Sequence, residues 1–261
     1  MVNYKKYDNG LRIIVNTMDA MMSVSAGILV GAGSCLENEQ NNGISHFIEH
    51  TTFKGTEKMS SFELSSAFDD IGAQVNAFTS KETTCYYVKS TVSEIERSFE
   101  LLSDMFLNSV YEKEELEKEK GVVKEEINMC LDTPEDLCLD ALSESYFGRQ
   151  GLGRTILGPA KNIDSFTKDD VLEYRGRFYN ADNIVLSFAG RISFERACEL
   201  AEKLFVPFVS AKKSDELSAG ETENAQGRIK IEKNIEQIHL ALAFKGVEYN
   251  APSADAMSVA K

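Results

Sequence analysis

Two classes of protein are excluded by what the 261-residue sequence lacks. It has no apolar run close to the roughly 20 residues that a membrane-spanning helix needs. Its opening stretch, MVNYKKYDNGLRIIVNTMDA, has no long apolar core of the secretory kind. We therefore expect a cytoplasmic protein without a membrane partner.

Cysteine pairs and basic residues are also scarce. The five cysteines are scattered and never spaced as C-x-x-C, which argues against a disulfide framework and against a thiolate zinc site. With 28 Lys and Arg against 42 Asp and Glu, the net charge is −14. Phosphate binding needs a basic surface, so we expect no nucleic-acid partner. The negative charge is compatible with a basic peptide as partner, although a need for solubility explains the acidity more simply.

What is present is the composition of a soluble globular protein, 43% hydrophobic and 27% charged. Residue patterns predict an α+β fold with a mixed or antiparallel sheet flanked by helices. We expect two neighbouring strands at 11–18 and 22–34, a hairpin at 73–92 and a strand at 183–190. Helices are predicted at 44–55, 60–72 (with Ser60 or Ser61 as N-cap), 93–109, 111–132 (interrupted only at Gly121), 133–148, 165–179 (with Ser165 at its start) and 193–205.

The composition changes near residue 210. Residues 210–227 are polar and have no apolar period, so we interpret them as a linker between a domain at 1–209 and a further segment at 228–261. That segment is predicted to begin with new β structure, which includes His239, and then a helix. The predicted order of elements repeats that of the N-terminus, which indicates an internal duplication cut short at Lys261.

The residues with the clearest chemistry lie in the stretch ISHFIEHTTF. His46 and His50 are two of only three histidines, and in a helix they lie on one face because they are four residues apart. Both imidazoles can then reach one metal ion, and Glu49 flanks the same face. A chance H-x-x-E-H has a probability on the order of a few in a thousand in such a chain.

A catalytic zinc site needs a third protein ligand and an open fourth position. The stretch EKEKGVVKEEIN supplies Glu119 and Glu126, which are seven residues apart and so lie on one face of a helix. One can ligate and the other brace, but spacing alone does not choose between them or among the other glutamates.

The sequence resembles the pitrilysin family of zinc peptidases, the inverzincins, whose motif is H-x-x-E-H. The resemblance rests on HFIEH followed, after 75 residues, by Glu126 inside EKEKGVVKEEI, and on the stretches GAGSCLENEQNNGISHFIEHTTFKGT and NAFTSKETTCYY. The resemblance extends over nearly the whole chain. Within the family, the sequence is most similar to bacterial relatives of the mitochondrial processing peptidase β subunit. It implies one of two homologous halves that form a clam-like chamber around a peptide.

The resemblance also implies roles for residues. His46, His50 and Glu126 would bind one Zn²⁺ per chain, Glu49 would be the general base, and Glu119 a supporting catalytic carboxylate. Residues Asn76, Ala77 and Phe78 would hold a peptide substrate as an added strand. The implied activity is that of a zinc metalloendopeptidase that cleaves peptides or unfolded polypeptide segments.

Alternatives stay open at this point. The chain could be a non-catalytic or inactive member that binds a peptide or a partner subunit, because the second half of the family fold is nearly absent after Lys261. A structural zinc domain would need a closed four-ligand site. Partners compatible with the resemblance are the missing C-terminal half, a partner subunit or a second copy.

Overall fold

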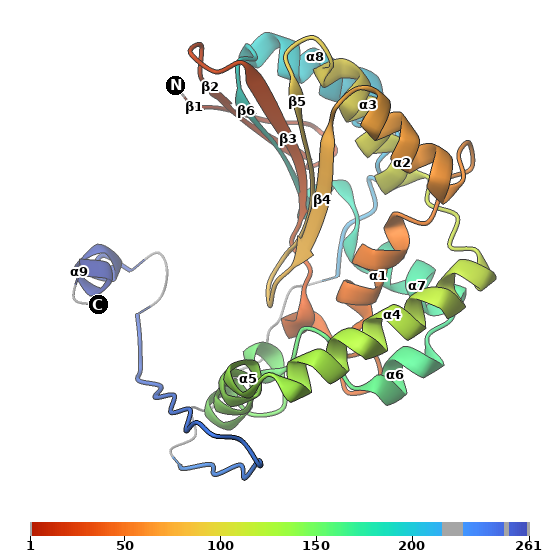
Figure 1. Cartoon of the computed structure of the whole chain (residues 1–261). Helices are drawn as coiled ribbons and strands as arrows, with labels where there is room; N and C mark the ends of the chain where they lie inside the picture. The colour runs from red at the N-terminus through yellow and green to blue at the C-terminus, as the bar shows by residue number, and fades with distance from the viewer. Residues whose placement is uncertain (1, 216–226, 248–250, 260–261) are drawn as a thin grey trace.

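A computed structural model of the protein shows a six-stranded sheet at its centre (Figure 1). The structure describes residues 2–215, 227–247 and 251–259. The strand order is β1-β2-β6-β3-β5-β4; β2 and β6 are parallel, and the other neighbours are antiparallel. The sheet is therefore mixed, which confirms the predicted α+β class. The strands are β1 Val2–Lys6, β2 Arg12–Thr17, β3 Ser23–Val30, β4 Gln74–Thr79, β5 Thr84–Thr91 and β6 Ile184–Gly190.

Strands β2 and β3 do not neighbour each other in the sheet, so that prediction was wrong. Strand β6 lies between them and pairs with both. The turn from β2 to β3 crosses the end of β6, where the Met18 N–H donates to the Gly190 carbonyl at 2.8 Å. Gly190 has φ +131°, and a Cβ there would lie 2.2 Å from the Ser23 carbonyl oxygen. A glycine is therefore required at the point where the late strand passes beneath the early turn.

Helices cover one face of the sheet and leave the other face open (Figure 1). The contacts include α3 with β5, α8 with β2 and α1 with β4. Alternation along the strands explains this asymmetry, since Ile13 and Val15 are fully buried whereas Ile14 between them is 37% exposed. The helices are α1 Ile44–Thr52, α2 Ser61–Asp70, α3 Ile95–Leu107, α4 Lys113–Asp132, α5 Pro134–Phe147, α6 Ala160–Ser165, α7 Lys168–Phe178, α8 Phe194–Leu204 and α9 Ala254–Val259, with 3₁₀ turns η1 Ser34–Leu36, η2 Gly151–Gly153 and η3 Ala181–Asn183.

Two helix starts and the course of α4 resolve or correct the sequence predictions. Ser60 is the N-cap of α2 and forms a capping box with Glu63. Thr167 rather than Ser165 begins α7, because its hydroxyl accepts from the N–H of Asp170. Helix α4 runs unbroken through Gly121, where an added Cβ would meet nothing within 4 Å. Strand β1 was not predicted.

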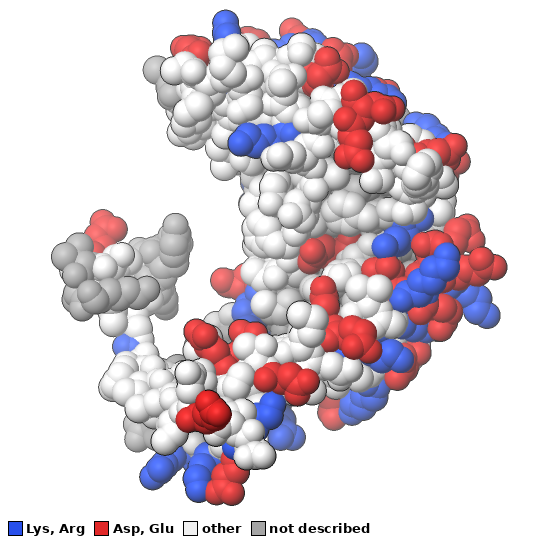
Figure 2. Space-filling view, in the orientation of Figure 1, with Lys and Arg blue, Asp and Glu red and all other residues white. Residues whose placement is uncertain are grey.

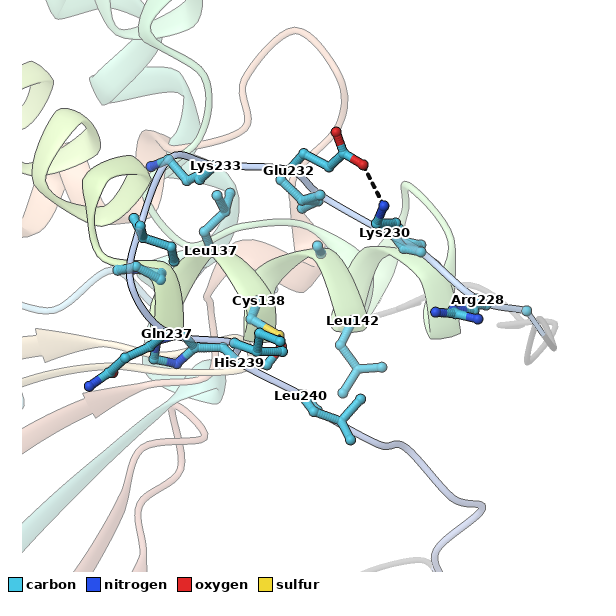
Figure 3. A pocket seen from close by; sticks show the side chains of 18 residues that line it. Leu137, Cys138, Leu142, Arg228, Lys230, Glu232, Lys233, Gln237, His239 and Leu240 are labelled. Atoms are coloured by element: carbon cyan, nitrogen blue, oxygen red, sulfur yellow. Dashed lines mark hydrogen bonds and ion pairs between the residues drawn. The ribbon is translucent and has the colours of Figure 1, made fainter.

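Described residues 228–247 contain no strand, which contradicts the expected β structure there. A strand forms only when a second segment pairs with its backbone, and this segment instead lies along α5 (Figure 3). His239 is therefore not a strand residue, and its carbonyl oxygen lies 3.9 Å from the Cys138 Sγ of α5. The predicted terminal helix is present as α9.

Most of the predicted linker lies outside the described residues. Residues 210–215 contain no helix or strand. They are held to the preceding domain, since the Ser214 hydroxyl donates to Asp182 at 2.7 Å and Asp215 pairs with Arg177. Among the helices in the described ranges, none is long and apolar enough to cross a bilayer. A cytoplasmic location stays a prediction.

Candidate metal centre

Helix α1 buries one side and presents its titratable residues on another. Ile44, Phe47 and Ile48 are at most 1% exposed and belong to the main core. That anchoring turns His46 and His50 toward α4, which packs beside α1 (Figure 1). The two imidazole rings lie with centroids 4.6 Å apart. The helical interpretation of the motif is thus confirmed.

Glu126 of α4 meets both imidazoles. Its Oε2 lies 3.5 Å from His46 Nε2 and 3.4 Å from His50 Nε2. One ligand atom from each of these three residues lies within 4.8 Å of the others, and no further such group was found in the part of the chain that the structure describes. Packing of α1 on α4 therefore selects Glu126 from the many glutamates of its helix.

These distances suit a tetrahedral metal ion. Zinc binds imidazole nitrogen and carboxylate oxygen at about 2.0–2.2 Å, so two of its ligands lie roughly 3.3–3.5 Å apart. The separations at Glu126 Oε2 are of that size without any rearrangement. Two nitrogens and one carboxylate oxygen also match the donor set of open zinc sites, so the residues fit the ion.

Glu119 braces His50 rather than joining the three converging residues. Its Oε2 accepts from His50 Nδ1 at 3.2 Å, and its Oε1 accepts from Lys54 Nζ at 2.6 Å. With the proton held on Nδ1, His50 keeps its Nε2 lone pair for a metal. Burial raises the pKa of Glu119, but the bonds from His50 and Lys54 outweigh it and leave the pKa below its usual value.

The two histidines differ in their proton affinity. Burial, with a smaller contribution from His50, lowers the pKa of His46 to about 4, so this imidazole is neutral at physiological pH. Burial also lowers the pKa of His50, yet the Glu119 bond and the nearby carboxylates raise it by more, and the net pKa lies above its usual value. Binding of a metal at His50 therefore competes with a proton.

Glu49 is close enough to His50 and Glu126 for both to affect its pKa, and it is held by the sheet. Its Oε2 accepts a hydrogen bond of 2.5 Å from the Thr79 hydroxyl at the end of β4. Burial raises the pKa of Glu49, and the bond from Thr79 opposes that rise. A half-buried carboxylate with a raised pKa suits proton transfer.

A buried carboxylate fixes the start of α1. Glu37 is 5% exposed and accepts from Asn42 Nδ2 at 2.8 Å, from the Gly43 N–H at 2.7 Å and from the Ser45 N–H at 2.8 Å. Gly43 has φ +100°, and a Cβ there would lie 2.5 Å from the Leu157 carbonyl oxygen. These contacts satisfy free N–H groups of the first turn and set the direction of α1.

The residues predicted to hold a peptide lie on β4, which ends the sheet and pairs only with β5 among the described strands. Asn76 and Phe78 are exposed. The Ala77 N–H donates to the Asn76 side-chain oxygen at 2.8 Å, so it points to the free edge rather than to β5.

The structure brings together the five residues singled out on α1 and α4, with Glu126 at the histidines and Glu119 behind His50. Sequence reasoning missed Glu37, Lys54 and Thr79. Thr79 belongs to the stretch NAFT, and Glu37 lies between the glycine turn and the motif, so the positions of both residues pointed to a role. Their partners could not be predicted, because their contacts are with segments distant in the chain.

Comparison with known proteins gives matches over almost all of the chain. The family model described as Insulinase (Peptidase family M16) matches residues 12–160, and that described as Peptidase M16 inactive domain matches residues 165–261. Strand β6 falls in the second match, so both matched segments contribute to one sheet.

Two relatives illustrate the similarity. The chain is 41% identical over 246 residues to the uncharacterized zinc protease YmxG of Bacillus subtilis (strain 168), covering 94% of this chain and 59% of that protein. It is 36% identical over 258 residues to the mitochondrial-processing peptidase subunit beta of Saccharomyces cerevisiae, covering 95% of this chain and 54% of that protein. The chain thus spans a little over half the length of these relatives.

A solved structure shares the fold. The crystal structure of a protease from Helicobacter pylori superposes with a TM-score of 0.77 at 21% identity, covering 86% of this chain and 54% of that one.

Proposed function

The chain belongs to peptidase family M16, the insulinase family, and on that basis we propose that it is the metal-binding half of a zinc-dependent endopeptidase. The observation that carries the proposal is the convergence of His46, His50 and Glu126 with Glu49 beside them. Substrates of this site are peptides or unfolded polypeptide segments.

In this proposal His46, His50 and Glu126 would hold one Zn²⁺. When bound, zinc supplies Lewis acidity toward a water molecule and toward the peptide carbonyl. Glu119 keeps the proton on His50 Nδ1 and so fixes the ring orientation. Lys54 balances the charge of Glu119.

Glu49 is the general base. It accepts the proton of the attacking water and passes it to the leaving amine, which is the usual double role of such a carboxylate. The raised pKa of Glu49 makes it a better proton acceptor near neutral pH. Thr79 bonds to Oε2, and Oε1 accepts no hydrogen bond from the described residues.

The peptide lies along the free edge of β4, at Asn76, Ala77 and Phe78. Its backbone takes the place of the Asn76 side chain at the Ala77 N–H. Main-chain bonds of this kind bind peptides with little dependence on their side chains. The open face of the sheet beside this edge is mostly uncharged (Figure 2), which agrees with recognition of the backbone.

A second candidate is a non-catalytic peptide-binding or partner subunit. It is favoured by the match of residues 165–261 to the family model described as Peptidase M16 inactive domain. In that case the chain binds zinc and peptide but does not cleave. A structural zinc site is disfavoured, because the described residues supply three ligands and not four. The second half, a partner subunit or a second copy would complete the chamber.

The test measures zinc content and cleavage of a quenched fluorescent basic peptide, with and without a chelator. It is made on this chain and on the intact protein that carries it. Chelator-sensitive cleavage by the intact protein supports the peptidase. Bound zinc without cleavage in either sample supports the second candidate, and an absence of bound zinc in both contradicts the metal site.

A further inference from the structure

The hydroxyl of Thr79 connects the sheet edge to the carboxylate of Glu49. Thr79 is the last residue of β4, and its Oγ1 donates to Glu49 Oε2. The bond joins two elements that are separated by helix α2 in the chain, so local geometry alone does not impose it. It depends on how β4 packs on α1.

Strand alternation explains why Thr79 reaches α1. Val75, Ala77 and Thr79 share the face of β4 that the helices cover, whereas Asn76 and Phe78 share the open face. Ala77, whose N–H points to the free edge, is two residues from Thr79. The same strand therefore carries both the proposed peptide contact and the donor to Glu49.

Glu49 has two carboxylate oxygens, and the hydrogen bond from Thr79 determines which of them is free to accept a proton. With Oε2 held by Thr79, Oε1 is left to face the attacking water. A hydroxyl donor to a carboxylate is a charge-assisted bond, stronger and more directional than a bond between neutral groups. Without it the side chain can rotate about its three χ angles.

We propose that Thr79 is a positioning residue, which orients Glu49 and aligns it with a peptide bound on β4. This inference rests on the proposed peptidase function. Thr79 itself does not touch the reacting atoms. Its effect on the reaction is exerted through Glu49.

The test compares Thr79→Val with Thr79→Ser in the intact protein. Valine keeps the shape and the strand preference of threonine but removes the donor, and serine keeps the donor. Thr91→Val is the matched control, since Thr91 ends β5 and its hydroxyl contacts Ser93 at 3.0 Å. Zinc content, thermal stability, kcat and KM are measured for each.

We expect Thr79→Val to bind zinc normally and to lower kcat roughly 10- to 100-fold, because misplacing a catalytic group by about 1 Å costs on the order of 10²-fold. KM should change by less than about threefold, as expected for an interaction that matters only in the transition state. Thr79→Ser should recover most of the lost kcat, and Thr91→Val should lose none. Crystal structures of the metal-free variants should show Glu49 in its native rotamer with serine and displaced with valine.

Several outcomes overturn the inference. They are an unchanged kcat in Thr79→Val, an effect confined to KM, loss of zinc or of folding in that variant, an equal defect in Thr79→Ser, or an unmoved Glu49. If the wild-type protein shows no chelator-sensitive cleavage, the proposed function fails instead. In that case the two crystal structures alone decide whether Thr79 orients Glu49.

Discussion

His50 Nε2 lies 3.4 Å from Glu126 Oε2, and this contact joins the motif helix to a helix that follows the entire β4–β5 hairpin and α3. Glu126 Oε2 also lies 3.5 Å from His46 Nε2, and the rings of His46 and His50 have centroids 4.6 Å apart. The site is therefore a property of the packing between α1 and α4. Removing one of its donors should therefore affect the metal before it affects the fold.

His50→Ala should lose bound zinc, because the two remaining donors do not complete a three-ligand site. Metal analysis of the purified variant, with wild-type protein expected to carry about one zinc per chain, checks this. A normal zinc content in the variant would remove His50 from the ligand set.

Glu49→Gln should keep zinc and lose peptide cleavage. The amide keeps the size of the side chain but cannot accept a proton, and general-base catalysis contributes typically about 10²–10⁴-fold. The measurements are zinc content and kcat of the intact protein. Turnover close to that of the wild type in a zinc-replete variant would show that Glu49 is not the general base.

Glu119→Gln should weaken zinc binding by roughly 10- to 100-fold, since carboxylates that orient a ligating histidine contribute about that much. Competition with a chelator measures the affinity. Glu125→Gln is the matched control: it lies on the same helix, is exposed, and removes the same charge. Equal losses in the two variants would attribute the effect to charge alone.

Ala77→Pro should raise KM and leave zinc binding intact. The Ala77 N–H faces the free edge of β4, so proline removes the proposed peptide contact without breaking the bonds to β5. One hydrogen bond corresponds to an increase of roughly two- to tenfold in KM. Ala77→Ser keeps the N–H and is the control. If both variants bind substrate as the wild type does, the peptide does not lie on this edge.

The stability of the metal-free chain should depend on pH through Glu37. Burial raises the pKa of Glu37, against the opposing bonds from Asn42, Gly43 and Ser45. The folded chain thus holds this proton to higher pH than the unfolded chain, whose glutamate titrates near about 4.3. The stabilisation is fully present below that pH and is lost as the pH rises through the folded pKa.

The comparison is with Glu37→Gln, which does not titrate. The unfolding free energy of wild type relative to this variant should fall as the pH rises above about 4, where the glutamate of the unfolded chain titrates. Urea denaturation in the presence of a chelator measures both proteins. A difference that grows with pH would mean that the hydrogen bonds at Glu37 outweigh its burial.

The sequence predicted those parts of the molecule that depend on local spacing. His46, Glu49 and His50 could be placed on one helix face because helical period alone decides it. Glu126 could not be chosen over its neighbours by spacing, since the choice is made by the packing of α4 on α1.

Other features could not be predicted from the sequence because they also depend on contacts between distant segments. Glu37 and Thr79 act through contacts with segments distant in the chain. Strand β1 is short and half polar, with the sequence VNYKK, and gave little signal. The apolar alternation at 228–247 predicted a strand, but a strand also needs a neighbour to pair with.

The place of β6 between β2 and β3 has a consequence for how the chain acquires its structure. During synthesis β2, β3 and both helices of the metal centre emerge long before Ile184–Gly190. Until then β2 and β3 each present an unpaired edge, which is a template for wrong pairing. Closing the sheet requires contacts between residues far apart in sequence, a step that is slow because loop closure precedes any gain. A nascent chain of this protein therefore has its metal ligands before it has a completed sheet to hold them, and a chaperone has its longest opportunity to act in that interval.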